Sequence, residues 1–223
     1  MIKVRLAALG LAVLSVALIA TPASAEKTVT KFSGKGATAY VSDCPANAPV
    51  GTKCNAWAIY VQKNRLNLDG TVSVFGGLGV DKFRVKFTAP ATFTLTPLGS
   101  GFNDTIAVQV ADDLSTASGS GTVGLVKCNR RGKDCETTRT NVSLSLSANA
   151  PATYFKDSTR TPKFEDCRTV TRTSFTERTA DGTATVNGVT FPTLVPRVPD
   201  IPASNITNSK EVTIARGECP QFP

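Results

Sequence analysis

The stretch KFRVKF, residues 82–87, decides the fold class, because charged and apolar residues alternate along all of it. Successive side chains of a β-strand point to opposite faces of a sheet, so a period of two gives one wet face and one buried face. We predict a strand that buries Phe83, Val85 and Phe87 and exposes the lysines and the arginine between them.

Strand patterns recur along the rest of the chain. Alternation or a run of β-branched residues occurs at residues 28–32, 56–61, 71–75, 92–96, 106–110, 122–126, 142–146, 168–176 and 211–214. In the second of these segments Trp57, Ile59 and Val61 share a face, which makes Trp57 a predicted core residue. Asn187-Gly188 stands between two valines, as in a hairpin with a type I′ turn. The sequence therefore predicts an all-β protein, an antiparallel β-sandwich of roughly ten to twelve strands.

The N-terminus has the pattern of a secretory signal peptide, residues 1–25. Lys3 and Arg5 precede an uncharged apolar run, residues 6–20, and a small-residue cleavage site follows at residues 23–25. The apolar run is shorter than the roughly 20 residues that span a bilayer. We expect a mature chain that is secreted to the extracellular space or a periplasm and does not span a membrane.

The mature chain, residues 26–223, is expected to form a single β-sandwich domain. An irregular stretch at residues 148–166 precedes a C-terminal part, residues 151–223, that either completes the same sandwich or forms a dependent lobe. Within this part, the proline-rich segment PTLVPRVPDIP, residues 192–202, should lie extended across the surface.

The six cysteines predict a disulfide-stapled protein, because all of them follow the signal peptide and an exported chain is oxidised. Their spacing favours neighbours pairing in order. The expected pairs are Cys44 with Cys54, Cys128 with Cys135, and Cys167 with Cys219. A zinc site would need several reduced thiols and no help from histidine, so we favour disulfides over zinc.

The chain contains no histidine, which excludes Ser-His-Asp and Cys-His catalysis and histidine-ligated metal sites. The G-x-S-x-G and phosphate-loop signatures are also absent from residues 26–223. We therefore expect no catalytic residue, no metal and no cofactor, and a protein that is not an enzyme. The alternative is a secreted glycan hydrolase that uses a pair of carboxylates across a cleft.

Three aspartates raise the question of a calcium site. Asp104, Asp112 and Asp113 lie at the two ends of one predicted strand, and loop carboxylates can bind Ca²⁺. Their spacing does not match an EF-hand, and aspartate is an ordinary turn residue that hydrogen-bonds its own backbone. We therefore interpret them as turn residues.

The segment CNRRGKDC, residues 128–135, carries the candidate binding site. Predicted strands flank it, so Cys128 and Cys135 should face each other at the end of a hairpin and form a disulfide. Such a staple would present a group of cations to an anionic partner at little ordering cost. These cations are Lys127, Arg130, Arg131 and Lys133.

Charge and composition favour binding as the function. The formal net charge is +8, yet basic and acidic residues interleave along the chain, and no specific nucleic-acid partner is indicated. We predict a secreted, non-catalytic binding or envelope-associated module for an anionic surface polymer or an acidic protein. A secreted protein inhibitor that presents a rigid loop is a further alternative to the glycan hydrolase.

Overall fold

The computed structural model describes residues 27–45, 48–89, 92–129, 134–160, 167–193 and 203–217. The strands are β1 (Thr28–Ser42), β2 (Lys53–Leu68), β3 (Thr71–Ala89), β4 (Thr92–Asn103), β5 (Val108–Val110), β6 (Thr116–Lys127), β7 (Glu136–Ala148), β8 (Thr153–Arg160), β9 (Arg168–Val186), β10 (Val189–Pro192) and β11 (Asn205–Arg216). All of their pairings are antiparallel. The prediction of an all-β, antiparallel protein with ten to twelve strands is confirmed.

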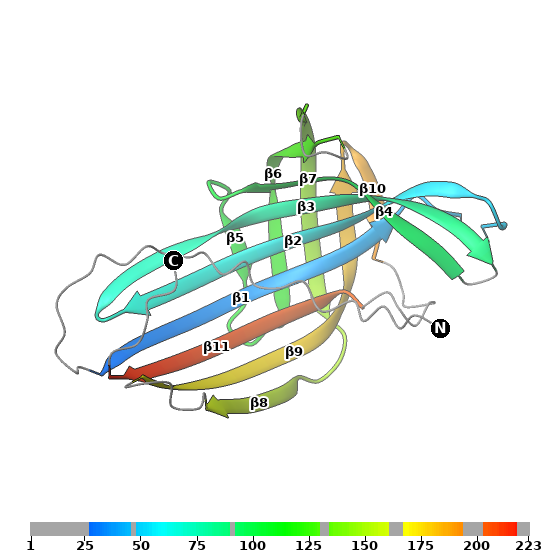
Figure 1. The fold of residues 1–223 in the computed structure, drawn as a ribbon. Coiled ribbons are helices and arrows are strands. Elements are labelled where there is room, and N and C mark those ends of the chain that lie inside the picture. Colours follow the sequence, from blue (N-terminus) through cyan, green and yellow to red (C-terminus); the bar gives the residue numbers. More distant parts are fainter. Residues whose placement is uncertain are drawn as a thin grey trace.

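The strands form one 11-stranded sheet that bends over on itself. Its main path runs β10-β9-β11-β1-β2-β3-β4-β6-β5, and β7 pairs with both β6 and β9, so the path returns to β9. In Figure 1, β11, β1, β2 and β3 form one layer, and β6 and β7 lie behind them and cross them steeply. The two layers expected of a sandwich are thus two parts of a single sheet, in the orthogonal form of sheet packing.

The hydrophobic core lies between these two layers. Ile59, Val61 and Leu78 face it from the first layer, and Val123 and Leu146 face it from the second. All of them are buried. Trp57 is also a core residue, as predicted, and its ring stacks on Phe191 with 5.4 Å between the ring centroids.

Strand β9 connects the layers, because its two halves have different partners. Residues 168–179 pair with β11, and residues 180–186 pair with β7. β9 ends in the predicted hairpin to β10, where Asn187 and Gly188 both have positive φ, 48° and 84°. The C-terminal strands therefore belong to the same sheet as the N-terminal ones.

Several strands are longer than the sequence pattern indicated. Residues 71–75 and 82–87 were expected as two strands, but they form the single strand β3. Residues 153–160, expected to be irregular, form β8, an edge strand that pairs with β9 and whose residues are all exposed. Within the described ranges, no helix is long and apolar enough to cross a membrane.

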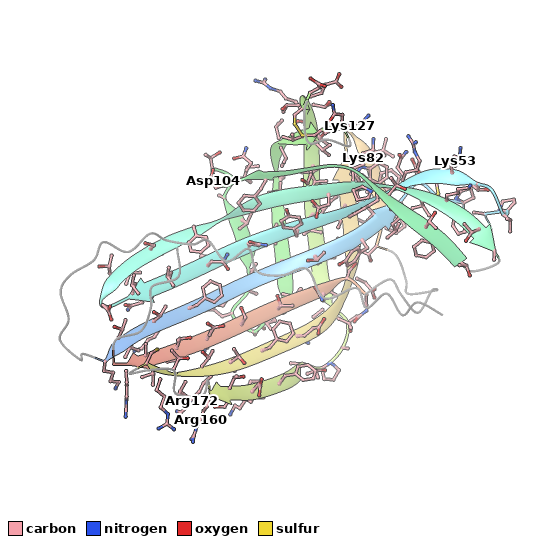
Figure 2. All side chains as sticks on the ribbon, in the orientation of Figure 1. Lys53, Lys82, Asp104, Lys127, Arg160 and Arg172 are labelled. Carbon is pink, nitrogen blue, oxygen red and sulfur yellow. A yellow bond between two sulfur atoms is a disulfide. The ribbon has the colours of Figure 1, made fainter. Side chains whose placement is uncertain are left out.

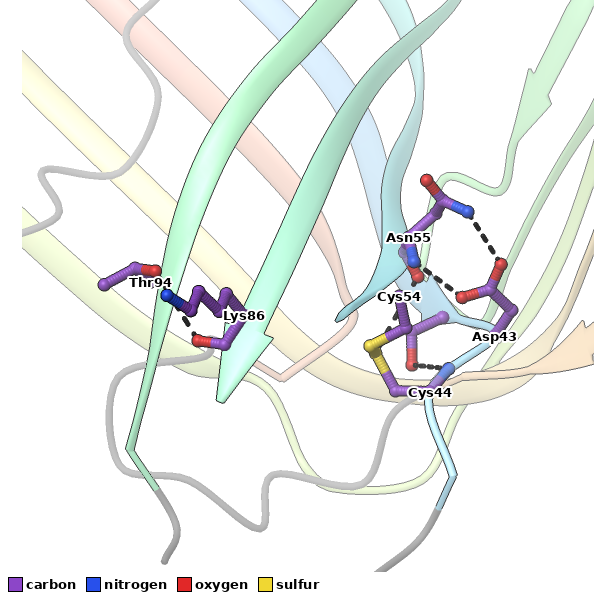
Figure 3. The surroundings of a disulfide bond; sticks show 7 residues. Asp43, Cys44, Cys54, Asn55, Lys86 and Thr94 are labelled. Atoms are coloured by element: carbon purple, nitrogen blue, oxygen red, sulfur yellow. Dashed lines mark hydrogen bonds between the residues drawn. A yellow bond between two sulfur atoms is a disulfide. The ribbon is translucent and has the colours of Figure 1, made fainter. Parts of the chain in front are cut away.

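Two predicted disulfides are confirmed, Cys44–Cys54 and Cys128–Cys135. The first lies beside Asp43, whose carboxylate accepts hydrogen bonds from the backbone and side chain of Asn55 at 2.6 and 2.9 Å (Figure 3). The second closes the β6–β7 hairpin. Cys167 is also disulfide-bonded. Its predicted partner Cys219, the signal peptide and residues 194–202 of the proline-rich segment lie outside the described residues, so those predictions stay untested.

Candidate functional site

Beyond the core, the long strands continue as a part of the sheet that we call the extension. It comprises residues 28–36 of β1, 62–68 of β2, 71–77 of β3, 153–160 of β8, 168–178 of β9 and 207–216 of β11. These strands pair without a register shift. The side of the sheet that faces the core therefore continues along the extension as one face. We call it the inner face, and the opposite side the outer face.

The inner face changes from apolar to cationic where the core ends. On β2, Ile59 and Val61 are buried, and the next two residues on the same face, Lys63 and Arg65, are exposed. On β1 the equivalent position next to the core is Lys35, which pairs in register with Lys63. The second layer of the sheet covers the apolar positions and does not cover the cationic ones.

Charges of opposite sign lie on opposite faces of the extension. Every lysine and arginine of these strand segments is on the inner face, namely Lys31, Lys35, Lys63, Arg65, Lys156, Arg160, Arg168, Arg172, Arg178, Lys210 and Arg216. The acidic residues of the same segments, Asp157, Glu177 and Glu211, are on the outer face. We call the inner face of the extension the basic face.

The cations of the basic face are close enough to act on one ligand. Lys210 and Arg65 flank Ser33 in one row of paired residues, and Lys63 is the next inward residue on the strand of Arg65. Neighbouring strands lie about 4.8 Å apart and successive inward positions about 6.8 Å apart, so the cations extend over roughly 20 Å across the strands and up to about 34 Å along them. Figure 2 shows Arg160 and Arg172 together at its β8–β9 edge.

One acidic residue compensates part of this charge. Lys35 and Lys63 lie directly opposite each other, and like charges in such a pair destabilise a sheet. Asp112, in the turn after β5, accepts a hydrogen bond from Lys35 Nζ, and this is the one ion pair between residues that the structure describes. The hydrogen bond, and then the charges of Lys35 and Lys63, hold the pKa of Asp112 below its ordinary value.

Arg178 is held by backbone oxygens, at the end of the basic face nearest the core. Its Nε donates to the carbonyl oxygen of Ala150 at 3.0 Å, and one terminal nitrogen donates to the carbonyl oxygen of Asp113 at 3.3 Å. Neither bond neutralises its charge. Arg65, Lys210 and Arg172 have no carboxylate partner among the described residues.

The far end of the basic face forms an open hollow. Its lining residues are Lys27, Val29, Lys31, Asn67, Asp69, Gly70, Val212 and Ile214. The inward positions Val29, Val212 and Ile214 give it an apolar floor, and Lys31 stands beside them. The basic face thus offers apolar contact as well as cations.

A second hollow lies at the opposite end of the sheet, and it includes one of the predicted binding residues. Lys127 lines it together with Trp57, Lys82, Arg84 and Glu136. The ammonium group of Lys82 lies 5.9 Å from the centroid of the Trp57 ring, a cation–π contact. Figure 2 shows Lys82 and Lys127 at this end, away from Arg160 and Arg172.

The other predicted binding residues, Arg130, Arg131 and Lys133, lie outside the described residues. The structure confirms the hairpin and the disulfide on which the prediction rests, since Lys127 pairs with Glu136 and Cys128 bonds to Cys135. The role of the tip in binding stays a prediction.

The aspartates considered for calcium have partners within the protein. Asp112 binds Lys35, and the Asp113 carboxylate accepts a hydrogen bond from the backbone nitrogen of Ser115 at 2.9 Å, as in an aspartate turn. Hydrogen bonds to Ser115 hold the pKa of Asp113 below its ordinary value. Elsewhere in the described ranges, Asp43 groups with Cys44 and Cys54, but these sulfurs form a disulfide and are not free to bind a metal.

Sequence reasoning missed the basic face because its residues come from strands far apart in the chain. A signal was present within single strands: Lys31 and Lys35, Lys63 and Arg65, and Arg168 and Arg172 are separated by even numbers of residues. Even spacing places side chains on the same face of a strand. The register between strands, which the sequence does not show, is needed to join these pairs into one surface.

Comparisons with known proteins give little further information. No family model matches the chain. No curated protein matches it either. One solved structure with a related outline is described as an acetoacetate decarboxylase-like enzyme from Sphingomonas wittichii RW1. It has 11% sequence identity, the match covers 85% of this chain and 91% of that one, and the TM-score is 0.29.

This neighbour corrects one expectation from the sequence. The prediction that the chain is not an enzyme is contradicted, because the structural neighbour is described as an enzyme, and we withdraw it. The lack of histidine excluded particular catalytic groups and not catalysis as such. At this TM-score and identity, the likeness carries no argument about what this chain does.

Proposed function

We propose that this protein binds an anionic polymer, and that the basic face of the extension is the binding surface. The observation that carries the proposal is the separation of charge within the strand segments of the extension: their lysines and arginines all lie on the inner face, and their aspartates and glutamates all lie on the outer face. Folding does not require this arrangement, because like charges on neighbouring strands oppose it. A ligand rich in carboxylate or sulfate groups would neutralise them.

The site of action proposed is outside the cytoplasm. The two described disulfides and the disulfide-bonded Cys167 support an oxidising compartment. The N-terminal sequence pattern supports export. An acidic surface polymer would be available to an exported protein, and an open cationic face that crosses several strands suits an extended chain better than a small enclosed ligand.

The test is retention of the protein on immobilised polygalacturonate and dextran sulfate at increasing salt, with neutral dextran as the control matrix. The variant replaces Lys63, Arg65 and Lys210 with glutamine, which removes three neighbouring cations of the basic face. Its matched control replaces Lys53, Lys86 and Arg139, exposed cations outside the extension. Both variants change the net charge equally.

We expect the basic-face variant to lose about tenfold in affinity, since exposed ion pairs contribute up to about 1 kcal/mol each. Wild-type retention should fall as salt rises. Equal losses in the two variants would mean that only net charge matters, and the proposal would be wrong. A third variant, with Arg130 and Arg131 replaced by serine, tests the hairpin tip. A loss in that variant alone would place the site at the tip.

A further inference from the structure

The outer face of the core strands carries a cluster of groups that the basic face does not use. Tyr40 of β1, Ala58 of β2 and Asp81 of β3 are paired in one row across the sheet. Tyr60 is the next outward residue on β2 after Ala58. The small side chain of Ala58 therefore lies between three larger polar side chains, and all three are half-buried.

Two aromatic rings extend the cluster toward β4. Tyr60 is paired with Gly79, and Gly79 is paired with Phe102. The Tyr60 ring lies over Gly79, where a Cβ atom would approach the ring carbons to 2.3 Å, so the glycine makes room for the ring. Tyr60 and Phe102 are stacked, with 6.2 Å between centroids and an interplanar angle of 14°. Phe102 is exposed at the edge of the cluster.

Among the described residues, the Asp81 carboxylate has no compensating group. It takes part in no ion pair or hydrogen bond with any residue that the structure describes. Burial raises its pKa above the ordinary value, and no cation acts in the opposite direction. Burial, and then the charge of Asp81, also raise the pKa of Tyr40 and that of Tyr60. A half-buried negative charge beside electron-rich rings is thus left unpaired.

We propose that Tyr40, Tyr60, Asp81 and Phe102 form a binding site for an organic cation, such as an alkylammonium group. The faces of aromatic rings attract cations, and a carboxylate among such rings adds an ion pair. The organic part of the ligand would cover the exposed Phe102 ring. This site lies on the outer face, so it is independent of the proposed binding of an anionic polymer to the inner face.

A cation fits this cluster better than a neutral sugar does. Stacked rings bind either ligand, but a sugar leaves the charge of a half-buried carboxylate uncompensated. Unpaired charges removed from water are costly, and an incoming cation removes that cost at Asp81. The inner face of the extension carries many lysines and arginines, yet no lysine or arginine of the described segments acts on Asp81.

The experiment is a nuclear magnetic resonance titration of the folded protein with tetramethylammonium and with n-butylammonium, following the tyrosine ring signals. tert-Butanol serves as the neutral ligand of similar size. We expect saturable binding of a cation with a dissociation constant on the order of 1–10 mM, because the ligands are small. Tighter binding of n-butylammonium would indicate a lysine side chain of a partner as the source, and tighter binding of tetramethylammonium a free quaternary amine.

The variants test separately whether binding needs the charge of Asp81 and whether it needs the ring of Tyr60. Asp81→Asn and Tyr60→Leu should each weaken binding about tenfold, whereas Tyr60→Phe, which keeps the ring, should bind as the wild type does. Asp157→Asn, on the outer face away from these rings, is the control and should change nothing. The proposal is overturned if wild type binds neither cation, if tert-butanol binds equally well, or if Asp81→Asn binds normally. Binding of methyl glucoside that needs Tyr60 but not Asp81 would also overturn it.

Discussion

The core part of the sheet and the extension are built from the same strands and follow the same period of two, but their inner faces differ. In the core part, inward residues such as Ile59 and Val61 are apolar and meet the second layer. A few residues further along β2, Lys63 and Arg65 occupy the equivalent inward positions in the extension. The inward residues change from apolar to charged at the point where the second layer stops covering the strand. The sequence of each strand therefore indicates which part of it is covered.

Contact with water explains why the extension is polar on its inner face, but it does not explain the sign of the charges. A wet surface is stable with mixed lysine and glutamate, and opposite charges on neighbouring strands would stabilise the sheet. The extension instead holds its acidic residues Asp157, Glu177 and Glu211 on the outer face. The comparison therefore separates a requirement of folding, which is polarity, from a feature that folding does not need, which is one sign of charge.

The largest expected effect tests this comparison on a single strand. Ile59→Ala should lower the free energy of unfolding by about 2–5 kcal/mol, because it leaves a cavity in the core. Arg65→Ala, on the same face of β2 but exposed, should change it by less than about 0.5 kcal/mol. Urea denaturation of both variants measures the difference. Similar losses would mean that the extension is covered and that its inner face is structural.

The second prediction concerns local opening. Strand β2 is paired with β1 on one side and β3 on the other in the core part and in the extension alike, so missing hydrogen bonds do not distinguish the two. Amides of residues 57–61 should nevertheless exchange with solvent about 100-fold more slowly than those of residues 63–67, because packing makes opening of the core costly. Hydrogen exchange measured by nuclear magnetic resonance gives both rates. Equal protection would show that the sheet opens as one unit.

The fold class, most of the strands and the β9–β10 turn could be predicted from the sequence. Period-two patterns located most strands, and the turn at Asn187-Gly188 has the predicted positive φ values. The prediction of two strands at residues 71–75 and 82–87 was wrong, since both belong to β3, and the segment between them contains Gly76. A Cβ at Gly76 would lie 2.1 Å from the carbonyl oxygen of Gln62, so this glycine allows close approach within a continuous strand. Composition alone does not distinguish that use of glycine from a turn.

The burial predicted for residues 82–87 is confirmed for some of these residues and not for others. Val85 is buried and Arg84 and Lys86 are exposed, as predicted, but Phe83 and Phe87 are only half-buried, and Lys82, predicted to be exposed, is half-buried too. The candidate site was less predictable than the fold, because it depends on which residues of distant strands are neighbours. The predicted binding site at residues 128–135 rests on cations that are close together in the sequence. The basic face instead brings together cations from strands β1, β2, β8, β9 and β11, most of which are far apart in the sequence.

A smaller effect is expected where the two parts meet. Asp112→Asn removes the partner of Lys35, so an anionic polymer should find one more free cation at the core end of the basic face. If the proposed binding surface is correct, affinity for dextran sulfate should rise by about twofold to fivefold, the size of one exposed ion pair. Asp104→Asn, an exposed aspartate without such a partner among the described residues, is the matched control. A rise of equal size in both variants would reflect net charge alone.

The smallest effect is expected on the outer face of the core strands, at Tyr60. Burial first, and the Asp81 carboxylate second, raise the pKa of Tyr60 to about 12. Asp81→Asn should therefore lower this pKa but leave it above the ordinary value of 10.0, because burial remains. Alkaline titration of phenolate absorbance measures this pKa, with Tyr60→Phe identifying the Tyr60 signal.

The raised pKa of Tyr60 also makes the stability of the protein depend on pH. Since the folded state holds this proton more tightly than the unfolded state, the associated stability is present below pH 10 and is lost as the pH rises toward 12. Asp157→Asn should leave the titration unchanged, and a Tyr60 pKa at the ordinary value in the wild type would show that its ring is in water and not packed over Gly79.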